Sequence, residues 1–228
     1  MQLGCANQFL LLQSMKFVFS LLLLCICVCG EVRAQLVDSL FANIPRDVLP
    51  MLDRTARLDM IDLYNSGLPA KAENVLGGQA EMVLKTADHI ALRTSDVGSW
   101  QLKVLPSDHD VFVLCIRTLQ RGGLSSSLSV YNRHWQVTKG DWLPQPGFDL
   151  LYKENKELSA MRQHELRTLL RDLPVVAEWQ DEGKVLVFRK DLTDLSREDK
   201  ADAQSCLRCA AYEWKEGRFE PVDYLNER

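Results

Sequence analysis

The residues of this sequence best suited to chemistry are two cysteines three positions apart, Cys206 and Cys209. Such a pair supports thiol–disulfide exchange when one thiol has a lowered pKa, usually at the start of a helix. Here the pair follows a predicted helix and enters a predicted strand, where residues three apart point to opposite faces and lie about 10 Å apart. We therefore expect packed thiols and keep a redox function of Cys206 and Cys209 as an alternative. A bridge from Cys115 to either residue also stays open.

Other arrangements lack part of what catalysis or metal binding requires. Asp108, His109 and Asp110 form an acidic loop with one imidazole, but neighbouring side chains in one loop seldom converge on an ion. A zinc site would need a second pair of ligands besides the cysteines. His134 precedes Trp135, but the serines at 125–127 lack the glycine pattern of a nucleophile elbow. The sequence therefore predicts no catalytic residue, no metal and no cofactor.

Aromatic residues are the remaining candidates for function. Tryptophans in strands most simply form core or cover a sheet, yet aromatic side chains also dominate binding interfaces. Two segments, 140–144 and 217–221, each follow an aromatic strand and carry an aromatic residue between a glycine and a proline. We therefore predict a partner-binding set that consists of Trp135, Trp142, Trp214 and Phe219.

The first part of the chain is predicted to be one helix followed by strands. Apolar residues at helical spacing predict a helix over 51–66, which ends before Gly67. The alternation then places His89 and Lys103 on a solvent-exposed face, which predicts antiparallel pairing. Six consecutive apolar residues at 111–116 predict a central strand covered on both faces. The predicted strands span 80–85, 89–93, 100–105, 111–119 and 126–137.

The second part repeats this order after a boundary at 144–147, which holds two prolines and a glycine. Leucines at helical spacing predict a helix over 153–173. Hairpins are predicted over 175–189 and 207–222, and Ser196 with Asp199 predicts the start of a short helix that runs to Gln204. We expect an α+β fold with antiparallel sheets, helices packed on one face, and two related halves at 35–147 and 148–228.

The first 34 residues have the pattern of a targeting segment. Met15 and Lys16 open a second start, residues 17–29 are apolar, and a small residue, Ala34, ends the segment. This pattern predicts a signal peptide over 1–34, cleaved after Ala34. Its apolar run of 13 residues is shorter than the roughly 20 needed to span a membrane, so we expect no spanning segment after cleavage. An anchoring helix and a lipoprotein attached through Cys29 stay lesser alternatives.

Charge and cysteine count limit the class of partner. Loss of Lys16, Arg33 and Glu31 with the leader changes the formal net charge from −4 to −5. Nucleic-acid binding requires a basic face, so this acidity argues against nucleic acid as a partner. Three cysteines remain after cleavage, which is too few for a disulfide scaffold. We therefore expect a periplasmic or secreted protein that does not depend on disulfides.

The run from Arg57 to Gly67, followed by Asn74 to Gly78, resembles an uncharacterised family of exported proteins from Bacteroides-type Gram-negative bacteria, a domain of unknown function. The resemblance covers nearly all of the mature chain, including Tyr212 to Phe219. It implies an α+β fold, and the family is associated with tandem-repeat folds like that of the β-lactamase inhibitor protein. It implies no activity, so no functional residue is carried over. The cysteine pair at 206 and 209 and the extended leader depart from the family.

These observations favour one class of function over two others. The missing catalytic sets, the tryptophan-rich strands and the exported address predict non-catalytic binding of a protein or cell-envelope component across a sheet surface. A thiol–disulfide enzyme that uses Cys206 and Cys209 is the first alternative. A structural or assembly subunit is the second.

Overall fold

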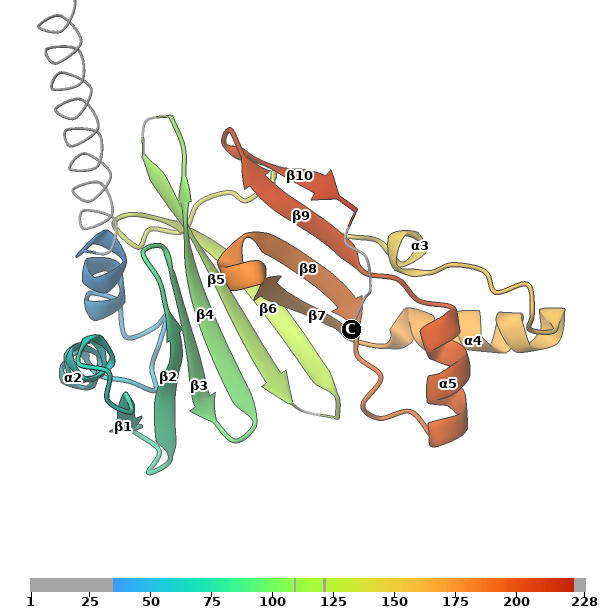
Figure 1. Cartoon of the computed structure of the whole chain (residues 1–228), viewed down its shortest axis with the longest axis horizontal. Helices are drawn as coiled ribbons and strands as arrows, with labels where there is room; N and C mark the ends of the chain where they lie inside the picture. The colour runs from blue at the N-terminus through green and yellow to red at the C-terminus, as the bar shows by residue number, and fades with distance from the viewer. Residues whose placement is uncertain (1–34, 109, 121, 224–228) are drawn as a thin grey trace, which may run out of the picture.

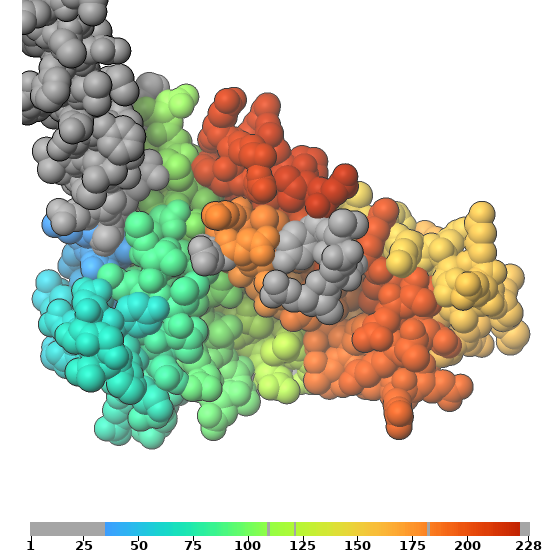
Figure 2. Space-filling view, viewed as in Figure 1, coloured from blue at the N-terminus to red at the C-terminus, as the bar shows by residue number. Residues whose placement is uncertain are grey.

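The structure is a computed structural model that describes residues 35–108, 110–120 and 122–223. The predicted signal peptide at 1–34 and His109 of the acidic loop lie outside these residues. No helix in the described part of the chain is long and apolar enough to cross a membrane. Figure 1 shows a first sheet, a second sheet beside it, and a group of helices beyond the second sheet. The N-terminal region and these helices lie at opposite ends of the longest axis (Figure 2).

The first sheet has six strands in the order in which they occur in the chain, and every neighbouring pair is antiparallel. Short turns connect the strands, and antiparallel neighbours need no crossover. The turn from β5 to β6 holds Gly122 and Gly123 at φ of 63° and 103°, where glycine avoids the strain of a Cβ atom. The strands are β1 (Lys71–Glu73), β2 (Gln79–Lys85), β3 (His89–Ser95), β4 (Gly98–Pro106), β5 (Val111–Gln120) and β6 (Leu124–Asn132).

The predicted strand over 126–137 is wrong at its end. The strand β6 stops at Asn132, and the chain turns back so that Tyr131 and Val137 form an isolated antiparallel bridge. Trp135 lies inside this turn with φ of 61°, a conformation that β-strands do not use. The long polar and aromatic run therefore contains a strand and a tight turn, which period-two alternation alone does not separate.

Helices from the N-terminal region cover one face of the first sheet. Residues 35–42 are helical, and α2 (Arg54–Asn65) follows. The side chain of Asp53 caps α2 by accepting a hydrogen bond of 2.8 Å from the backbone of Ala56. The helix predicted over 51–66 is confirmed with a later start, because this cap begins the helix after Asp53.

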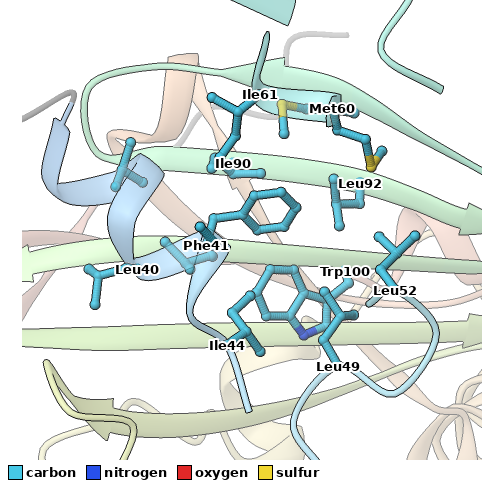
Figure 3. Close-up of a cluster of buried hydrophobic side chains, with 14 of the residues drawn as sticks. Leu40, Phe41, Ile44, Leu49, Leu52, Met60, Ile61, Ile90, Leu92 and Trp100 are labelled. Atoms are coloured by element: carbon cyan, nitrogen blue, oxygen red, sulfur yellow. The ribbon is translucent and has the colours of Figure 1, made fainter. Parts of the chain in front are cut away.

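The core beneath these helices is apolar and closely filled (Figure 3). Phe41 lies beside Trp100 of β4, with 6.5 Å between ring centroids. Met60 and Ile61 of α2 and Leu92 of β3 close the same cluster, and all five side chains are buried. This burial is what holds the helices on the sheet, since isolated helices of about 12 residues are marginal in water.

The second sheet has four strands in the order β10-β9-β8-β7, again all antiparallel. The hairpins predicted over 175–189 and 207–222 are confirmed. The turn between the first two strands contains a single 3₁₀ turn, η1 (Asp181–Gly183). The strands are β7 (Val175–Gln180), β8 (Val185–Lys190), β9 (Ala210–Lys215) and β10 (Arg218–Val222).

The two sheets share a core on the face of the first sheet opposite the N-terminal helices. Leu114 and Ile116 of β5 pack there against Ala177 of β7 and Leu186 of β8. Side chains of the first sheet also satisfy the edge of β7. The hydroxyl of Ser126 accepts a hydrogen bond of 3.0 Å from the backbone N–H of Ala177 and donates one of 3.3 Å to its carbonyl oxygen. The second sheet is therefore held by packing and by backbone hydrogen bonds.

The prediction that His89 and Lys103 face solvent is wrong. His89 on β3 lies opposite Lys103 on β4 in the register of the sheet. Both residues are buried: His89 is 2% exposed and Lys103 is 7% exposed. The alternation of apolar and polar residues was read correctly, but the polar face meets the second sheet rather than water. The alternation of residues along a strand indicates that one face of the strand is more polar than the other. It does not indicate whether water or another part of the protein covers the more polar face.

Three helices form a separate cluster beyond the second sheet: α3 (Phe148–Leu151), α4 (Ala160–Asp172) and α5 (Arg197–Ser205). The predicted start of the helix over 153–173 is wrong, because Ser159 caps α4 by accepting a hydrogen bond from the backbone of Arg162. The predicted cap of α5 is confirmed, since Ser196 accepts a hydrogen bond of 3.1 Å from the backbone of Asp199.

The predicted fold class is confirmed: the protein is α+β, with antiparallel sheets of six and four strands. The first sheet lies within 35–147 and the second within 148–228. Each carries its own helices. The relationship of the two halves by a repeat stays a prediction, as does the boundary between them.

Candidate functional site

Three of the four predicted partner-binding residues meet between the two sheets. Trp142 lies 5.0 Å from Trp214 and 5.9 Å from Phe219, measured between ring centroids, and Phe112 packs against the same group at 4.9 Å from Trp142. The indole N–H of Trp214 donates a hydrogen bond of 2.8 Å to the carbonyl oxygen of Pro106. These rings are half-buried, so each offers only part of its surface to a partner.

Trp135 lies apart from the other three predicted residues. It is 9% exposed and belongs to the core beneath the N-terminal helices, where its ring packs 5.4 Å from that of Tyr131. The predicted set of four therefore divides into one buried ring and one half-buried group. The sequence grouped Trp142 and Phe219 as equivalent positions of the two glycine–proline segments, and in the structure the two rings meet through packing between the sheets.

A cleft of about 310 Å³ opens beside the half-buried rings. The ammonium of Lys103 lines it, pairs with the carboxylate of Asp88 at 2.8 Å, and lies 5.5 Å from the ring centre of Trp179. Glu213 lines the opposite wall and pairs with Lys215 at 2.5 Å. Three of the four charged side chains that line this cleft, Asp88, Lys103 and Glu213, are thus already paired within the protein; the fourth is Lys184.

His89 lies behind this cleft, in a place where the sequence showed only an isolated histidine. Its Nε2 atom is 3.3 Å from Oε1 of Gln101, and the backbone N–H of Trp179 points at the same oxygen from 3.5 Å. Burial, and then the charge of Lys103, lower the pKa of His89 to about 4. Gly183 packs directly on both, because a Cβ atom there would lie 2.8 Å from Nδ1 of His89 and 3.0 Å from Nζ of Lys103.

The three cysteines of the described chain are free thiols in three different clusters. Cys115 is in the core beneath the N-terminal helices, Cys206 is buried among α3, α4 and α5, and Cys209 is half-buried beside β8. Burial raises the pKa of the Cys115 and Cys209 thiols. The structure therefore has packed thiols, and it contains neither a Cys206–Cys209 bridge, as the alternative redox function would use, nor a bridge from Cys115.

The remaining candidate residues are scattered. His134 and His164 are exposed, and Asp110 lies 3.9 Å from Arg133. The described residues contain no group of three or more histidine, cysteine or carboxylate side chains placed to hold a metal ion. The candidate histidines and the acidic loop therefore do not converge on a metal site within the described part of the chain.

A second and wider cleft, which we call the basic groove, runs between the end of β8, α5 and the start of β9. Its volume is about 810 Å³. Four cations line it, Arg189, Lys190, Lys200 and Arg208, together with a single carboxylate, Asp191. The chain as a whole has a formal net charge of −4, so the positive charge of the groove is opposite in sign to the net charge of the protein.

Each cation of the basic groove uses some of its N–H donors in hydrogen bonds to other parts of the protein, and these bonds hold the side chain in place. Lys190 donates to the carbonyl oxygens of Arg171 and Leu173 at the end of α4, at 3.0 and 2.6 Å. Arg208 donates to the carbonyl oxygens of Asp149 and Leu150 at 3.0 and 2.8 Å. Cations near helix ends also interact favourably with the carbonyl dipoles there. These contacts fix the positions of the charges.

The other two cations retain more free capacity. Lys200 donates one hydrogen bond of 2.9 Å, to the carbonyl oxygen of Thr193. Arg189 uses its Nε atom to pair with Glu178 at 3.2 Å. A lysine has three N–H donors and an arginine five, so several donors around the basic groove have no partner among the described residues.

The carboxylate of Asp191 is already engaged within the protein, so it does not weaken the attraction of the four cations for an anionic ligand. It is 4% exposed, and its two oxygens accept hydrogen bonds from the backbone of Leu124, at 2.7 Å, and the hydroxyl of Thr193, at 2.8 Å. The carboxylate therefore ties the end of β8 to the first sheet. The basic groove can accordingly bind carboxylate or phosphate groups through ion pairs and hydrogen bonds.

Sequence reasoning did not identify the basic groove. Its cations come from β8, α5 and the turn before β9, and Lys190 and Lys200 each directly adjoin an aspartate in the sequence, Asp191 and Asp199. The adjacent pair Arg189 and Lys190 was a weak signal. The convergence of the four side chains depends on how α5 packs beside the second sheet.

Comparisons with known proteins place the chain in a family and a fold. The family model described as "Protein of unknown function (DUF3256)" matches residues 29–219. A solved structure of a domain of an uncharacterized protein from Porphyromonas gingivalis W83 is similar, with a TM-score of 0.66 and 24% identity. That match covers 82% of this chain and 99% of the other. A search of curated proteins gives no significant match. The resemblance to a family of unknown function is thus confirmed, and the finer likeness to a tandem-repeat inhibitor stays a prediction.

Proposed function

We propose that this chain, which belongs to the DUF3256 family of proteins of unknown function, is a non-catalytic binding protein. Its ligand is a protein or cell-envelope component that presents carboxylate or phosphate groups to the basic groove. The observation that carries this proposal is the convergence of four cations around about 810 Å³, with one carboxylate that is already committed.

The chemistry of the basic groove supports an anionic ligand over a neutral one. Guanidinium groups present a planar fork that matches carboxylate and phosphate oxygens, and a charge-assisted hydrogen bond is roughly twice as strong as a neutral one. Arg189 lies on β8 and Arg208 lies in the turn before β9, and both line the same groove, so one ligand can contact both. A neutral ligand would leave these cations without compensation.

The same groove supports binding rather than turnover. Cys209 is the one thiol among the residues that line the groove, and burial raises the pKa of this thiol, so the reactive thiolate is scarce at neutral pH. The lining side chains include no histidine. A general base near the ligand is therefore missing from the residues that line the groove.

The place of action is proposed from the leader alone. If residues 1–34 act as a signal peptide, the basic groove faces the periplasm or the exterior, where anionic envelope polymers and exported proteins are available. The half-buried group formed by Trp142, Trp214 and Phe219 is then a second, aromatic contact area on the same protein.

Direct binding tests this proposal with two defined anions, inorganic pyrophosphate and a hexaglutamate peptide. We expect at least one to bind the full mature chain, with an affinity that falls as salt rises. A Lys200→Gln/Arg208→Gln variant should bind at least tenfold more weakly. A Lys71→Gln/Lys139→Gln variant loses the same charge at exposed positions outside the groove and should bind normally.

The two probes separate the two sources of anionic groups. Preference for pyrophosphate indicates a phosphorylated envelope component, and preference for hexaglutamate indicates an acidic protein segment. Equal binding by the two variants, or no binding of either probe at low salt, would contradict the proposal. Circular dichroism of each variant checks that the loss of the Arg208 contacts leaves the fold intact.

A further inference from the structure

The two sheets formed by the described residues have four edges, and three of these edges are closed to further strands. The strand β1 has only three residues, two of them charged, and β10 carries two charged residues and Pro221 among its five residues. The edge of β7 is closed at Ala177, whose backbone N–H and C=O both form hydrogen bonds with the hydroxyl of Ser126. Short strands, charges, prolines and side-chain caps are the ways in which natural proteins prevent unwanted pairing at an edge.

The fourth edge, that of β6, has none of these protections along its middle. The strand is nine residues long and contains no charged residue and no proline. Its pairing with β5 is regular from Gln120 and Leu124 to Phe112 and Asn132. Ser125, Ser127 and Ser129 present small exposed side chains, which obstruct an incoming strand very little.

Hydrogen bonds at the two ends show which backbone groups of β6 point outward. The carbonyl oxygen of Val130 accepts a bond of 3.0 Å from the backbone N–H of Thr138, and the N–H of Leu124 donates one of 2.7 Å to Asp191. Every second residue of a strand points its N–H and C=O the same way. Ser126 and Leu128, which lie between, therefore also point outward, and their backbone groups have no hydrogen-bond partner among the described residues.

A groove adjoins this open stretch. It has a volume of about 640 Å³ and lies between the end of β6 and the segment that leaves it at 137–145. Leu128 and Leu143 line it, and Val137, which is 80% exposed, stands at its rim. Asp141 is the only charged residue among those that line it. The groove therefore suits an apolar side chain followed by a basic one.

We infer that the edge of β6 between Leu124 and Val130 binds an extended peptide segment of a partner protein by strand addition. The peptide pairs with the backbone of Ser126 and Leu128 and places apolar and basic side chains in the adjoining groove. Strand addition uses backbone hydrogen bonds for affinity and side-chain pockets for specificity. This site is separate from the basic groove and does not depend on it.

The ends of the open stretch favour a peptide over a second folded copy. The chain's own residues 136–138 already pair with the far end of β6, and Asp191 closes the near end. The distance between these two limits is roughly 20 Å, which suits a strand of about six residues. A two-fold pairing of β6 with β6 of another copy would bring both flanking segments into the same space.

The probe is a phage-displayed library of random decapeptides, selected on the immobilised mature chain and followed by synthesis of the enriched peptides. We expect enriched peptides to slow amide hydrogen exchange at Ser126 and Leu128 at least tenfold. A Ser127→Lys/Ser129→Lys variant should bind them at least tenfold more weakly, because lysine blocks natural sheet edges. A Thr55→Lys/Thr168→Lys variant adds the same charge on two helices and should bind normally.

Three outcomes would overturn the inference: no peptide is enriched, peptides bind without protecting these two amides, or the free protein dimerises with them already protected. The last result would assign the edge to a second copy. The Lys200→Gln/Arg208→Gln variant of the basic groove should keep its peptide binding, so the two sites can fail independently.

Discussion

Acidification should destabilise this protein through His89. The side chain is 2% exposed, lies beside the ammonium of Lys103, and has a pKa of about 4 in the folded protein. An unfolded histidine has a pKa near 6.5. Between these values the unfolded chain takes up a proton that the folded chain does not, so stability is present above pH 6.5 and is lost as the pH falls toward 4.

The size of the effect follows from the two pKa values. Between pH 7 and pH 5 the linkage relation assigns His89 a loss of about 2 kcal/mol in the free energy of unfolding. Most carboxylates stay ionised over this interval, so they contribute less to the change. Asp88 faces the same region and pairs with Lys103, which keeps one negative charge near the imidazole.

Urea unfolding followed by tryptophan fluorescence at pH 7, 6 and 5 measures this loss. A His89→Gln variant should be less stable at pH 7 through poorer packing, but its stability should change by less than about 1 kcal/mol over the same interval. A His164→Gln variant removes an exposed histidine and should keep the steep dependence, because His89 remains. If His89→Gln loses as much stability as the parent chain, the assignment of the pH dependence to His89 is wrong.

Three further predictions follow from particular contacts. Gly183→Ala should destabilise the protein by about 2 kcal/mol or more in urea unfolding, because the backbone at Gly183 has φ of 88° and the new Cβ atom would meet two buried side chains. The control Gly217→Ala should cost distinctly less, because Gly217 has a similar φ of 79° but no atom within 4 Å of the new Cβ position. Ser126→Ala should cost about 1–2 kcal/mol by leaving the edge of β7 unsatisfied, whereas Ser127→Ala, at an exposed position, should change stability by less than about 0.5 kcal/mol. Alkylation of the native protein with iodoacetamide, followed by mass spectrometry, should modify Cys209 slowly and the two buried thiols not at all; a 206–209 disulfide in the isolated protein would instead support the redox alternative.

Local signals in the sequence predicted the elements whose limits depend on nearby residues. Ser196 and Asp199 are three positions apart, and their capping contacts begin α5 where the sequence indicated. The hairpins of the second sheet were equally clear, because glycines mark their turns and strand residues flank them. The start of α4 was missed because Leu158 continues the leucine spacing one residue before Ser159, which caps the helix.

The candidate sites depend on contacts between residues far apart in the chain. Nothing near Arg208 in the sequence indicates that it shares a groove with Arg189, and nothing near Ser126 indicates that it satisfies the edge of β7. The aromatic prediction was partly informative, since large rings at strand positions are readily placed in a core. Which rings would meet, and which would be buried alone like Trp135, depended on how the sheets pack.

Taken by itself, the amino-acid sequence determined the fold class, the two groups of strands and the cap that begins α5, because these depend on side-chain periodicity and on hydrogen bonds within a few residues. Tertiary structure alone decided that a second sheet covers His89 and Lys103, that four cations converge in one groove, and that the edge of β6 stays open. The physical reason is that periodicity shows which face of an element is more polar, whereas the partner of that face is chosen by packing between segments distant in the chain.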